Sequence, residues 1–134
     1  MYKDMTTLDM VKEFHKAFGA DIDVPWDAEA LNLRLALIRE GFYEVEEAID
    51  NYNTYKNSNN TATNAEMLLK ELCDLQYVLD GTFVALGLDK QVAFNRVHKS
   101  NMSKLGTDGK PIYRDDGKVL KGPNYKEPDL GDLV

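Results

Sequence analysis

The apolar residues between positions 31 and 49 recur at alternating steps of four and three. This is the period of one buried face of an α-helix, whereas the side chains of a β-strand alternate every two residues. Asp27 stands where a capping residue is expected, so the sequence predicts one long helix from there to about Tyr52. The residues of this predicted buried face are Leu31, Leu35, Ile38, Phe42, Val45 and Ile49.

Two more helices are predicted on either side of this long one. The segment Thr6–Asp9 is typical of a capping box, and Gly19 is a good C-terminal stop, so a first helix is expected between them. A second capping box at Thr63–Glu66 opens a further helix, which Gly87 ends. The residues expected to point inward are Met10, Phe14, Ala17 and Phe18 on the first of these, and Leu68, Leu72, Leu75, Leu79 and Leu86 on the other.

The chain changes character near Leu105. Before it, Asp89 can cap a fourth helix that runs to about Met102, with Val92, Phe94 and Val97 inward. The tail of residues 106–134 holds three of the four prolines and five of the nine glycines. Within it the segment Lys110–Leu120 shows a weak alternation, and turn signals stand at residues 108–109 and 115–117, so a small hairpin is predicted. An extended arm follows, which we expect to lie on the helical body or on a partner subunit.

Length and composition narrow the class of protein. At roughly 150 residues per domain, 134 residues predict a single domain, 1–134, with a helical body of about residues 5–105. The lone Cys73 excludes a disulfide framework, a CxxC pair and a four-cysteine zinc site. Neither a membrane-spanning run nor a signal-peptide core is present, so we expect a cytoplasmic protein without a membrane partner. A net charge of −7 argues against nucleic acid as partner, but a divalent metal could still bring in an anionic small molecule.

Carboxylates gather on two of the predicted helices. A seam that begins with Leu33 and Leu37 continues as a row of three glutamates at the same helical spacing, and the next helix carries two acidic residues three apart. Unpaired carboxylates are costly to bury, and hard Mg²⁺ or Mn²⁺ ions prefer carboxylate oxygens. The pattern therefore favours a metal site, although a glutamate-rich helix face is usually only a solvated one. The residues are Glu40, Glu44 and Glu47, and then Glu71 and Asp74; the nearby basic residues are Arg34, Arg39 and Lys70.

Two segments resemble a known family. Leu37–Ala48 reads L-I-R-E-G-F-Y-E-V-E-E-A and resembles the pattern L-I-x-E-E-x-x-E-x-x-E-A. Glu71–Val78 reads E-L-C-D-L-Q-Y-V and resembles E-L-x-D-L-x-Y-V. Together they resemble the ExxE…ExxD signature of the all-α NTP pyrophosphohydrolases, which include MazG, the dimeric dUTPases and phosphoribosyl-ATP pyrophosphohydrolase.

The C-terminal part extends the resemblance. Val97–Lys104, followed by residues 109–111 and 117–123, is similar to the C-terminal signature of the MazG-like, phosphoribosyl-ATP-pyrophosphohydrolase-like branch. One position departs from the family pattern, because Gly41 stands where the family usually has a second glutamate ligand. Either Glu40 replaces it, or the ExxE register moves to residues 44–47. We prefer the first reading, since the lead-in before Glu40 is kept.

The resemblance implies an all-α, MazG-like four-helix bundle completed by oligomerisation, as a homodimer or a dimer of dimers. It also implies Mg²⁺-dependent hydrolysis of a nucleoside triphosphate, a dNTP or a noncanonical NTP, to the monophosphate and pyrophosphate, with Mn²⁺ as a substitute metal. By match to the motifs the metal ligands are Glu40, Glu44, Glu71 and Asp74, the residues that could accept the proton of the attacking water are Glu40 and Glu47, and the substrate-binding residues are Asn101, Lys104, Lys118 and Lys121.

Two other functions remain open at this stage. Gly41 is compatible with a catalytically weakened module that binds nucleotides for regulation. A purely structural helical dimer with a solvated acidic seam would explain the periodicity equally well. Residues that could contact a nucleobase are Phe14, His15, Phe18 and Trp26, although aromatic residues at helical spacing more often belong to a core.

Overall fold

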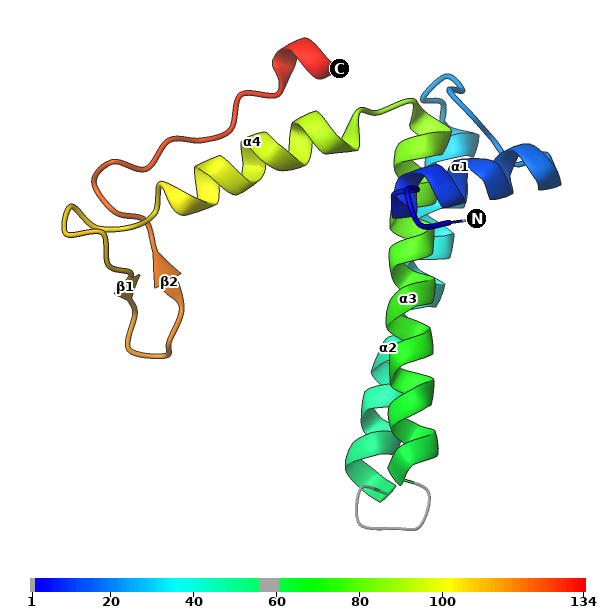
Figure 1. The fold of residues 1–134 in the computed structure, drawn as a ribbon, viewed down its shortest axis with the longest axis horizontal. Helices are drawn as coiled ribbons and strands as arrows, with labels where there is room; N and C mark the ends of the chain where they lie inside the picture. Colours follow the sequence, from blue (N-terminus) through cyan, green and yellow to red (C-terminus); the bar gives the residue numbers. More distant parts are fainter. Residues whose placement is uncertain (1, 56–60) are drawn as a thin grey trace. The chain divides into compact units, whose positions relative to one another are not determined.

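The computed structural model describes residues 2–55 and 61–134, and these are mostly helical (Figure 1). The elements are α1 (Thr7–Phe18), α2 (Ala28–Tyr55), α3 (Thr61–Leu86), α4 (Lys90–Met102), β1 (Ile112–Tyr113), β2 (Val119–Leu120) and the short 3-10 helix η1 (Gly131–Leu133). The predicted all-α class with a small hairpin in the tail is confirmed. None of the helices in the described ranges is long and apolar enough to cross a membrane.

The chain forms two compact units, Met1–Leu88 and Asp89–Val134. The first contains α1, α2 and α3, and the second contains α4, the hairpin and the C-terminal arm. That the chain acts as one domain stays a prediction, and the two units are described separately below.

Helix α1 is capped as its sequence predicts. The Thr6 hydroxyl accepts a hydrogen bond from the Asp9 amide at 3.1 Å, and the Asp9 carboxylate accepts one from the Thr6 amide at 3.0 Å. Gly19 ends the helix with a φ of 70°, a left-handed conformation that glycine adopts without strain. The buried residues are Val11 and His15, which form a different face from the predicted one.

The predicted inward face of α1 is therefore wrong in part. Phe14 is 41% exposed and Phe18 is 73% exposed. Their rings stack on each other at 4.3 Å between centroids, and Phe14 meets the Tyr77 ring edge-on at 5.5 Å. The aromatic side chains thus gather beside the contact of α1 with α3, while the smaller Val11 lies within the contact.

Helices α2 and α3 pack side by side in opposite directions (Figure 1). Asp27 caps α2 as predicted, because its carboxylate accepts a hydrogen bond from the Ala30 amide at 2.9 Å. Helix α2 runs beyond the predicted end to Tyr55. The residues of α2 buried in this unit are Ala30, Arg34, Gly41, Val45 and Ala48.

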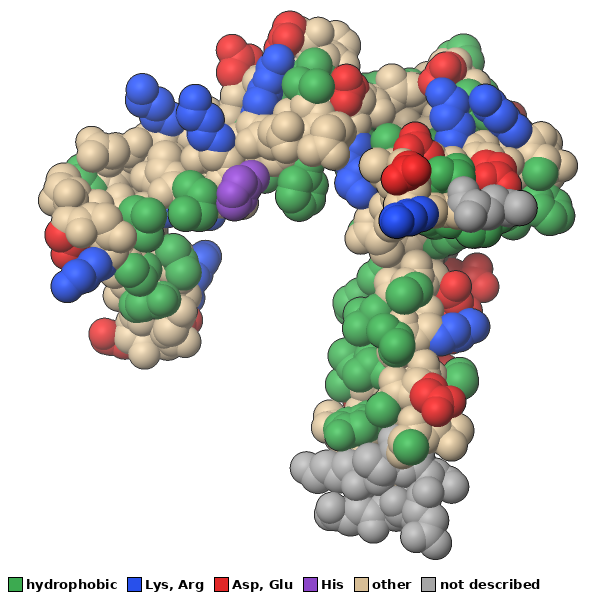
Figure 2. All heavy atoms as spheres, in the orientation of Figure 1, with side chains coloured by type: hydrophobic (Ala, Val, Ile, Leu, Met, Phe, Trp, Pro, Cys, Tyr) green, Lys and Arg blue, Asp and Glu red, His purple; other side chains and the backbone are tan. Residues whose placement is uncertain are grey.

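This buried seam lies next to the predicted one. Of the predicted face, Val45 is buried and Ile38 half-buried, whereas four large residues are exposed: Leu31 41%, Leu35 44%, Phe42 53% and Ile49 42%. The helical period was right and the buried face wrong, because the two helices approach through small residues. A Cβ added to Gly41 would lie 3.1 Å from Leu75 Cδ1 and 3.6 Å from Leu75 Cα. Figure 2 shows apolar side chains exposed along this helix pair.

Helix α3 begins at Thr61, so the predicted capping box at Thr63–Glu66 is wrong and these residues lie inside the first turns. The predicted end is confirmed by Gly87, which has a φ of 66°. Leu68, Leu75, Leu79 and Leu86 are half-buried, whereas Leu72, also predicted inward, is 47% exposed.

The loop between α1 and α2 closes the C-terminal end of α3. The amides of Asp23 and Val24 donate to the carbonyls of Val84 and Ala85, at 3.1 and 2.9 Å. The Trp26 indole N–H donates to the Leu86 carbonyl at 2.8 Å. The last turn of a helix leaves its carbonyls without intrahelical partners, so these three bonds supply donors there, and the Val84 carbonyl also accepts from the Gly87 amide at 3.3 Å.

A polar cluster lies under α1. The buried Arg34 guanidinium donates from Nε to the Thr82 hydroxyl at 3.2 Å and from Nη2 to the Val78 carbonyl at 3.0 Å. His15 Nδ1 donates to the Asp21 carbonyl at 2.7 Å. Gly81 makes room for both side chains, since an added Cβ would lie 2.7 Å from Arg34 Nη2 and 2.9 Å from His15 Nε2.

In the second unit, α4 starts and ends as predicted. The Asp89 carboxylate caps it by accepting from the Val92 amide at 3.1 Å. Val92 and Val97 are half-buried, but Phe94 is 60% exposed, so its predicted inward position is wrong. The predicted hairpin is confirmed as an antiparallel pair in which Ile112 faces Leu120 and Tyr113 faces Val119.

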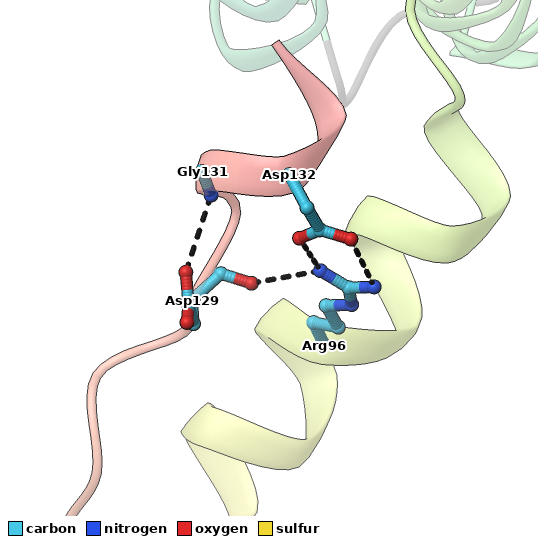
Figure 3. A network of polar contacts seen from close by, with 4 residues as sticks. All are labelled: Arg96, Asp129, Gly131 and Asp132. Atoms are coloured by element: carbon cyan, nitrogen blue, oxygen red, sulfur yellow. Dashed lines mark hydrogen bonds and ion pairs between the residues drawn. The ribbon is translucent and has the colours of Figure 1, made fainter.

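The C-terminal arm lies along α4. This agrees with the first of its two predicted positions, on the helical body. The Ser100 hydroxyl donates to the Lys126 carbonyl at 2.7 Å, and the Ser103 hydroxyl accepts from the Lys126 amide at 3.0 Å. Farther on, the Arg96 guanidinium holds both carboxylate oxygens of Asp132 and the carbonyl of Asp129 (Figure 3). Polar bonds therefore fix an arm that has few apolar residues.

Candidate active site

Two carboxyl groups meet between α2 and α3. Glu44 is half-buried, and Glu71 is 6% exposed and lies within hydrogen-bonding reach of it. The pKa of Glu44 is raised above its ordinary value by this hydrogen bond, then by desolvation, and then by repulsion from Glu71 and Glu40. Glu71 Oε2 is buried, and no group among the described residues donates a hydrogen bond to it. Two acceptors thus face each other, and a proton or a cation is needed to join them.

Lys70 balances part of this charge from the side. Its Nζ lies 3.1 Å from Glu71 Oε1 and 3.1 Å from Asp74 Oδ2. These contacts raise the pKa of Lys70, with Asp74 contributing more than Glu71. The Lys70 side chain is 61% exposed, so the pairs are screened by water and contribute little to stability. Lys70 therefore pairs with Glu71 Oε1 and leaves Glu71 Oε2 without a donor among the described residues.

A pocket of about 190 Å³ opens beside the two carboxyl groups. The residues that line it are Glu44, Glu47, Ala48 and Asn51 of α2 and Asn64, Met67 and Glu71 of α3. Because the helices run in opposite directions, Glu44 and Glu71 lie at one end and Asn51 and Asn64 at the other. Asn64 Nδ2 is buried, and no acceptor among the described residues receives its hydrogen bond.

Some of the predicted acidic residues line the pocket and others do not. Glu44, Glu47 and Glu71 line the pocket. Glu40 is exposed one turn from Glu44 and acts on it through charge. Asp74 is half-buried and paired with Lys70. Their roles as ligands or proton acceptors stay predictions.

The two asparagines of the pocket were missed by sequence reasoning. Asn51 lies seven residues after Glu44, and Asn64 lies seven residues before Glu71. Seven residues are close to two helical turns, so each asparagine shares a face with its glutamate. This spacing was the available signal, but asparagine near a helix end is ordinarily a surface residue.

A divalent metal is compatible with this chemistry. In the part of the chain that the structure describes, no group of three or more His, Cys, Asp or Glu side chains is already arranged to hold an ion. The pair of Glu44 and Glu71 nevertheless offers oxygen ligands, one of them buried without a donor. Mg²⁺ is commonly held by one or two carboxylates and keeps several waters, so this pair fits such an ion.

The residues predicted to contact phosphates belong to the second unit. The Lys104 amide donates to the Asn101 carbonyl at 3.2 Å, and the Lys104 carbonyl accepts from the Gly122 amide at 2.8 Å, next to Lys121. Lys121 Nζ lies 4.7 Å from the centre of the Tyr125 ring. Lys118 is exposed at the hairpin. The fold thus brings Asn101, Lys104 and Lys121 to the end of α4.

The aromatic candidates for base contact separate into two groups. Phe14 and Phe18 line a hollow of about 380 Å³ together with Tyr77. His15 is buried in the polar cluster, and Trp26 is tied to the end of α3. His15 and Trp26 therefore make contacts that are structural.

The comparison with protein families agrees with the motifs. A family model described as phosphoribosyl-ATP pyrophosphohydrolase matches residues 11–101, more than half of the 134 residues. The matched range contains both acidic segments and Asn101, and it ends before Lys104, Lys118 and Lys121. No curated protein matches the chain. The chain belongs to the phosphoribosyl-ATP pyrophosphohydrolase family, a MazG-like branch of the all-α NTP pyrophosphohydrolases.

Proposed function

We propose that this protein hydrolyses a nucleoside triphosphate to the monophosphate and pyrophosphate with the help of a divalent cation, Mg²⁺ or Mn²⁺. The family supports pyrophosphohydrolase activity in general. The choice of a dNTP or a noncanonical NTP as substrate, and a cytoplasmic role in clearing such nucleotides, are parts of the proposal.

The observation that carries the proposal is the Glu44–Glu71 pair. The raised pKa of Glu44 reflects an acceptor facing an acceptor, beside a pocket. Holding two carboxyl groups in this way destabilises a protein unless a cation or proton joins them. Perturbed carboxylates in a cleft are typical of sites that do chemistry.

Glu44 and Glu71 would hold the cation, with Glu40 and Asp74 at its flanks. The bound cation would neutralise the phosphates and the charge that develops on them during hydrolysis. Glu47 lines the same pocket one turn from Glu44, where its carboxylate can accept the proton of the attacking water. Glu40 is the alternative proton acceptor, since it is close enough to act on the pKa of Glu44.

Asn101, Lys104, Lys118 and Lys121 would contact the outer phosphates. The ammonium groups of the three lysines carry the charge that stabilises a leaving pyrophosphate, and the Asn101 carboxamide adds an uncharged polar contact. Changing Lys104 or Lys118 to Ala should raise KM more than it changes kcat if the contact is made equally in the ground state. Lys126→Ala, at an exposed lysine outside the three signature segments, is the matched control.

Pyrophosphate release from a panel of NTPs and dNTPs tests the proposal. Release that needs Mg²⁺ and is lost in Glu71→Gln supports it. The control is Glu46→Gln, because Glu46 is exposed on α2 and does not line the pocket. Failure of the wild-type protein to release pyrophosphate from any member of the panel would reject it.

A second candidate is a catalytically weakened nucleotide-binding module, and Gly41 favours it. Position 41 is a glycine that is buried against Leu75. It therefore supplies no carboxylate where the family usually has one. Nucleotide binding without pyrophosphate release would identify this module, and the absence of both would identify a structural helical protein.

A second copy of the chain is the partner that we propose for the exposed faces of α2 and α3. Exposed apolar residues at helical spacing form an extended patch, which monomeric proteins rarely leave in water. The residues are Leu31, Leu35, Phe42 and Ile49 on α2 and Leu69 and Leu72 on α3. Light scattering should give at least twice the mass of one 15.2 kDa chain, and a single-chain mass would contradict the proposal.

A further inference from the structure

The pocket between α2 and α3 contains two unmatched groups of opposite kind. Glu71 Oε2 is a buried acceptor without a donor, and Asn64 Nδ2 is a buried donor without an acceptor, among the described residues. Both residues line the same pocket. Buried polar groups are nearly always hydrogen-bonded, because each one left unpaired destabilises the folded state.

The two groups are too far apart to satisfy each other. Asn64 and Glu71 lie seven residues apart on α3, which corresponds to about 10 Å along a helix axis. A molecule that fills the pocket lengthwise can satisfy both. It must bring a cation or a donor to Glu71 and an acceptor to Asn64.

The residues that line the pocket indicate the charge of the part of the bound molecule that reaches Asn64. Glu44, Glu47 and Glu71 are acidic, so a phosphate at the asparagine end would be repelled by carboxylates along the pocket. Ala48 and Met67 supply apolar surface in the middle, and Asn51 adds a second carboxamide at the far end. Apolar walls with a few polar groups that fix orientation are typical of sites for uncharged organic groups. About 190 Å³ is enough for a sugar or a base and not for a whole nucleotide.

We propose that Asn64 Nδ2 donates a hydrogen bond to an uncharged acceptor atom of the nucleoside, on its base or its sugar, and thereby helps to select the substrate. This inference rests on the proposed function, since it takes the cation and phosphates to be held at the Glu44–Glu71 end. Asn64 is a specificity-determining residue in this account.

The test compares wild type, Asn64→Leu and Asn64→Asp on a panel of nucleotides. The panel holds all four bases as both ribo- and deoxynucleoside triphosphates, and both binding and kcat/KM are measured with Mg²⁺. Asn64→Leu removes the donor, and Asn64→Asp replaces the donor with an acceptor at nearly constant shape. Asn53→Leu is the matched control, because Asn53 is exposed on α2 and does not line the pocket.

The expected result is a changed preference. Asn64→Leu should lose about 10-fold in kcat/KM for the preferred nucleotide and little for the others, as expected for one hydrogen bond to a buried group. A change that follows the base places the acceptor on the base, and a change between ribo- and deoxynucleotides places it on the sugar. Asn64→Leu should also raise the Tm of the nucleotide-free protein, because it removes a buried unmatched amide.

Three results would overturn the inference. One is an equal loss for all nucleotides in both variants, which would mean a phosphate contact or a structural role. Another is an unchanged order of preference in Asn64→Leu and Asn64→Asp while pyrophosphate is still released, which rejects this inference and leaves the proposed function intact. The last is a wild-type protein that binds no nucleotide, which rejects both.

Discussion

The Glu44 carboxyl on α2 meets the Glu71 carboxyl on α3 within hydrogen-bonding reach, and this contact raises the pKa of Glu44. The two residues come from separate acidic segments of the sequence, 27 positions apart, and only the packing of the helices joins them. Their repulsion destabilises the protein when no cation is bound. The same repulsion makes the pair a good ligand for a cation, which is why stability and function should change in opposite directions here.

Replacing Glu44 with Gln should stabilise the metal-free protein at neutral pH. The substitution removes the repulsion, and the new amide can donate a hydrogen bond to the Glu71 carboxylate. Because the pKa of Glu44 is raised in the folded state, its contribution to stability is present at pH values below the unfolded-state pKa of about 4.5. That contribution is lost as the pH rises through the folded-state pKa. The Tm difference between Glu44→Gln and wild type should therefore be positive at pH 7 and shrink toward pH 4.5. An equal difference at every pH would contradict this assignment, and Glu46→Gln is the control.

Divalent metal should stabilise the folded protein through the same pair. A ligand that binds only the native state adds about 2.7 kcal/mol to the free energy of unfolding at a concentration 100 times its Kd. We expect millimolar Mn²⁺ to raise the Tm of wild type, a chelator to reverse the rise, and Glu71→Gln to abolish it. A metal-induced rise of equal size in Glu71→Gln would show that the ion binds elsewhere.

Gly81 should tolerate a methyl group less well than Gly41 does. Alanine is favoured over glycine by about 1 kcal/mol within a helix, so both substitutions gain from propensity. At Gly81 the new Cβ would displace the buried Arg34 and His15, with overpacking of about 1–3 kcal/mol added to the loss of their hydrogen bonds. At Gly41 it would meet the end of the Leu75 side chain, which can move. In denaturant unfolding, the free energy of unfolding should be lower for Gly81→Ala than for wild type and close to wild type for Gly41→Ala. The reverse order would contradict the described packing.

The C-terminal arm should loosen from α4 at acidic pH. Hydrogen bonds from Arg96 lower the pKa of Asp132, so this pair stabilises the arm above the unfolded Asp value of about 3.8 and loses the effect as the pH falls through the folded value. Protection of the Gly131 and Leu133 amides from hydrogen exchange, corrected for intrinsic rates, should fall in that range. Asp132→Asn should show low protection at every pH, and Asp115→Asn, in the hairpin turn, should behave as wild type.

The helices could be predicted from the sequence because period and capping are local properties. Thr6 and Asp27 cap helices as their neighbours indicate, and Gly19 and Gly87 end them. The start of α3 was wrong because a Thr-x-x-Glu spacing also fits inside a helix, where residues three apart share a face.

The buried face of α2 could not be predicted from hydrophobicity. Two neighbouring seams share the helical period, and the one richer in large apolar residues is exposed in this chain, whereas Ala30, Gly41 and Ala48 are buried. Which seam packs on α3 depends on how closely two helices can approach, and that is a property of the pair. The acidic pocket followed the motifs, but Asn64 became visible only when the structure placed its amide and Glu71 at the two ends of one cavity.

The products formed from a nucleoside triphosphate test the central claim most directly. Phosphorus NMR distinguishes a monophosphate with pyrophosphate from a diphosphate with inorganic phosphate. With Mg²⁺ and a substrate from the panel, wild type should give monophosphate and pyrophosphate in equal amounts, and Glu44→Gln and Glu71→Gln should give neither. A diphosphate product, or turnover that survives both substitutions, would contradict the account.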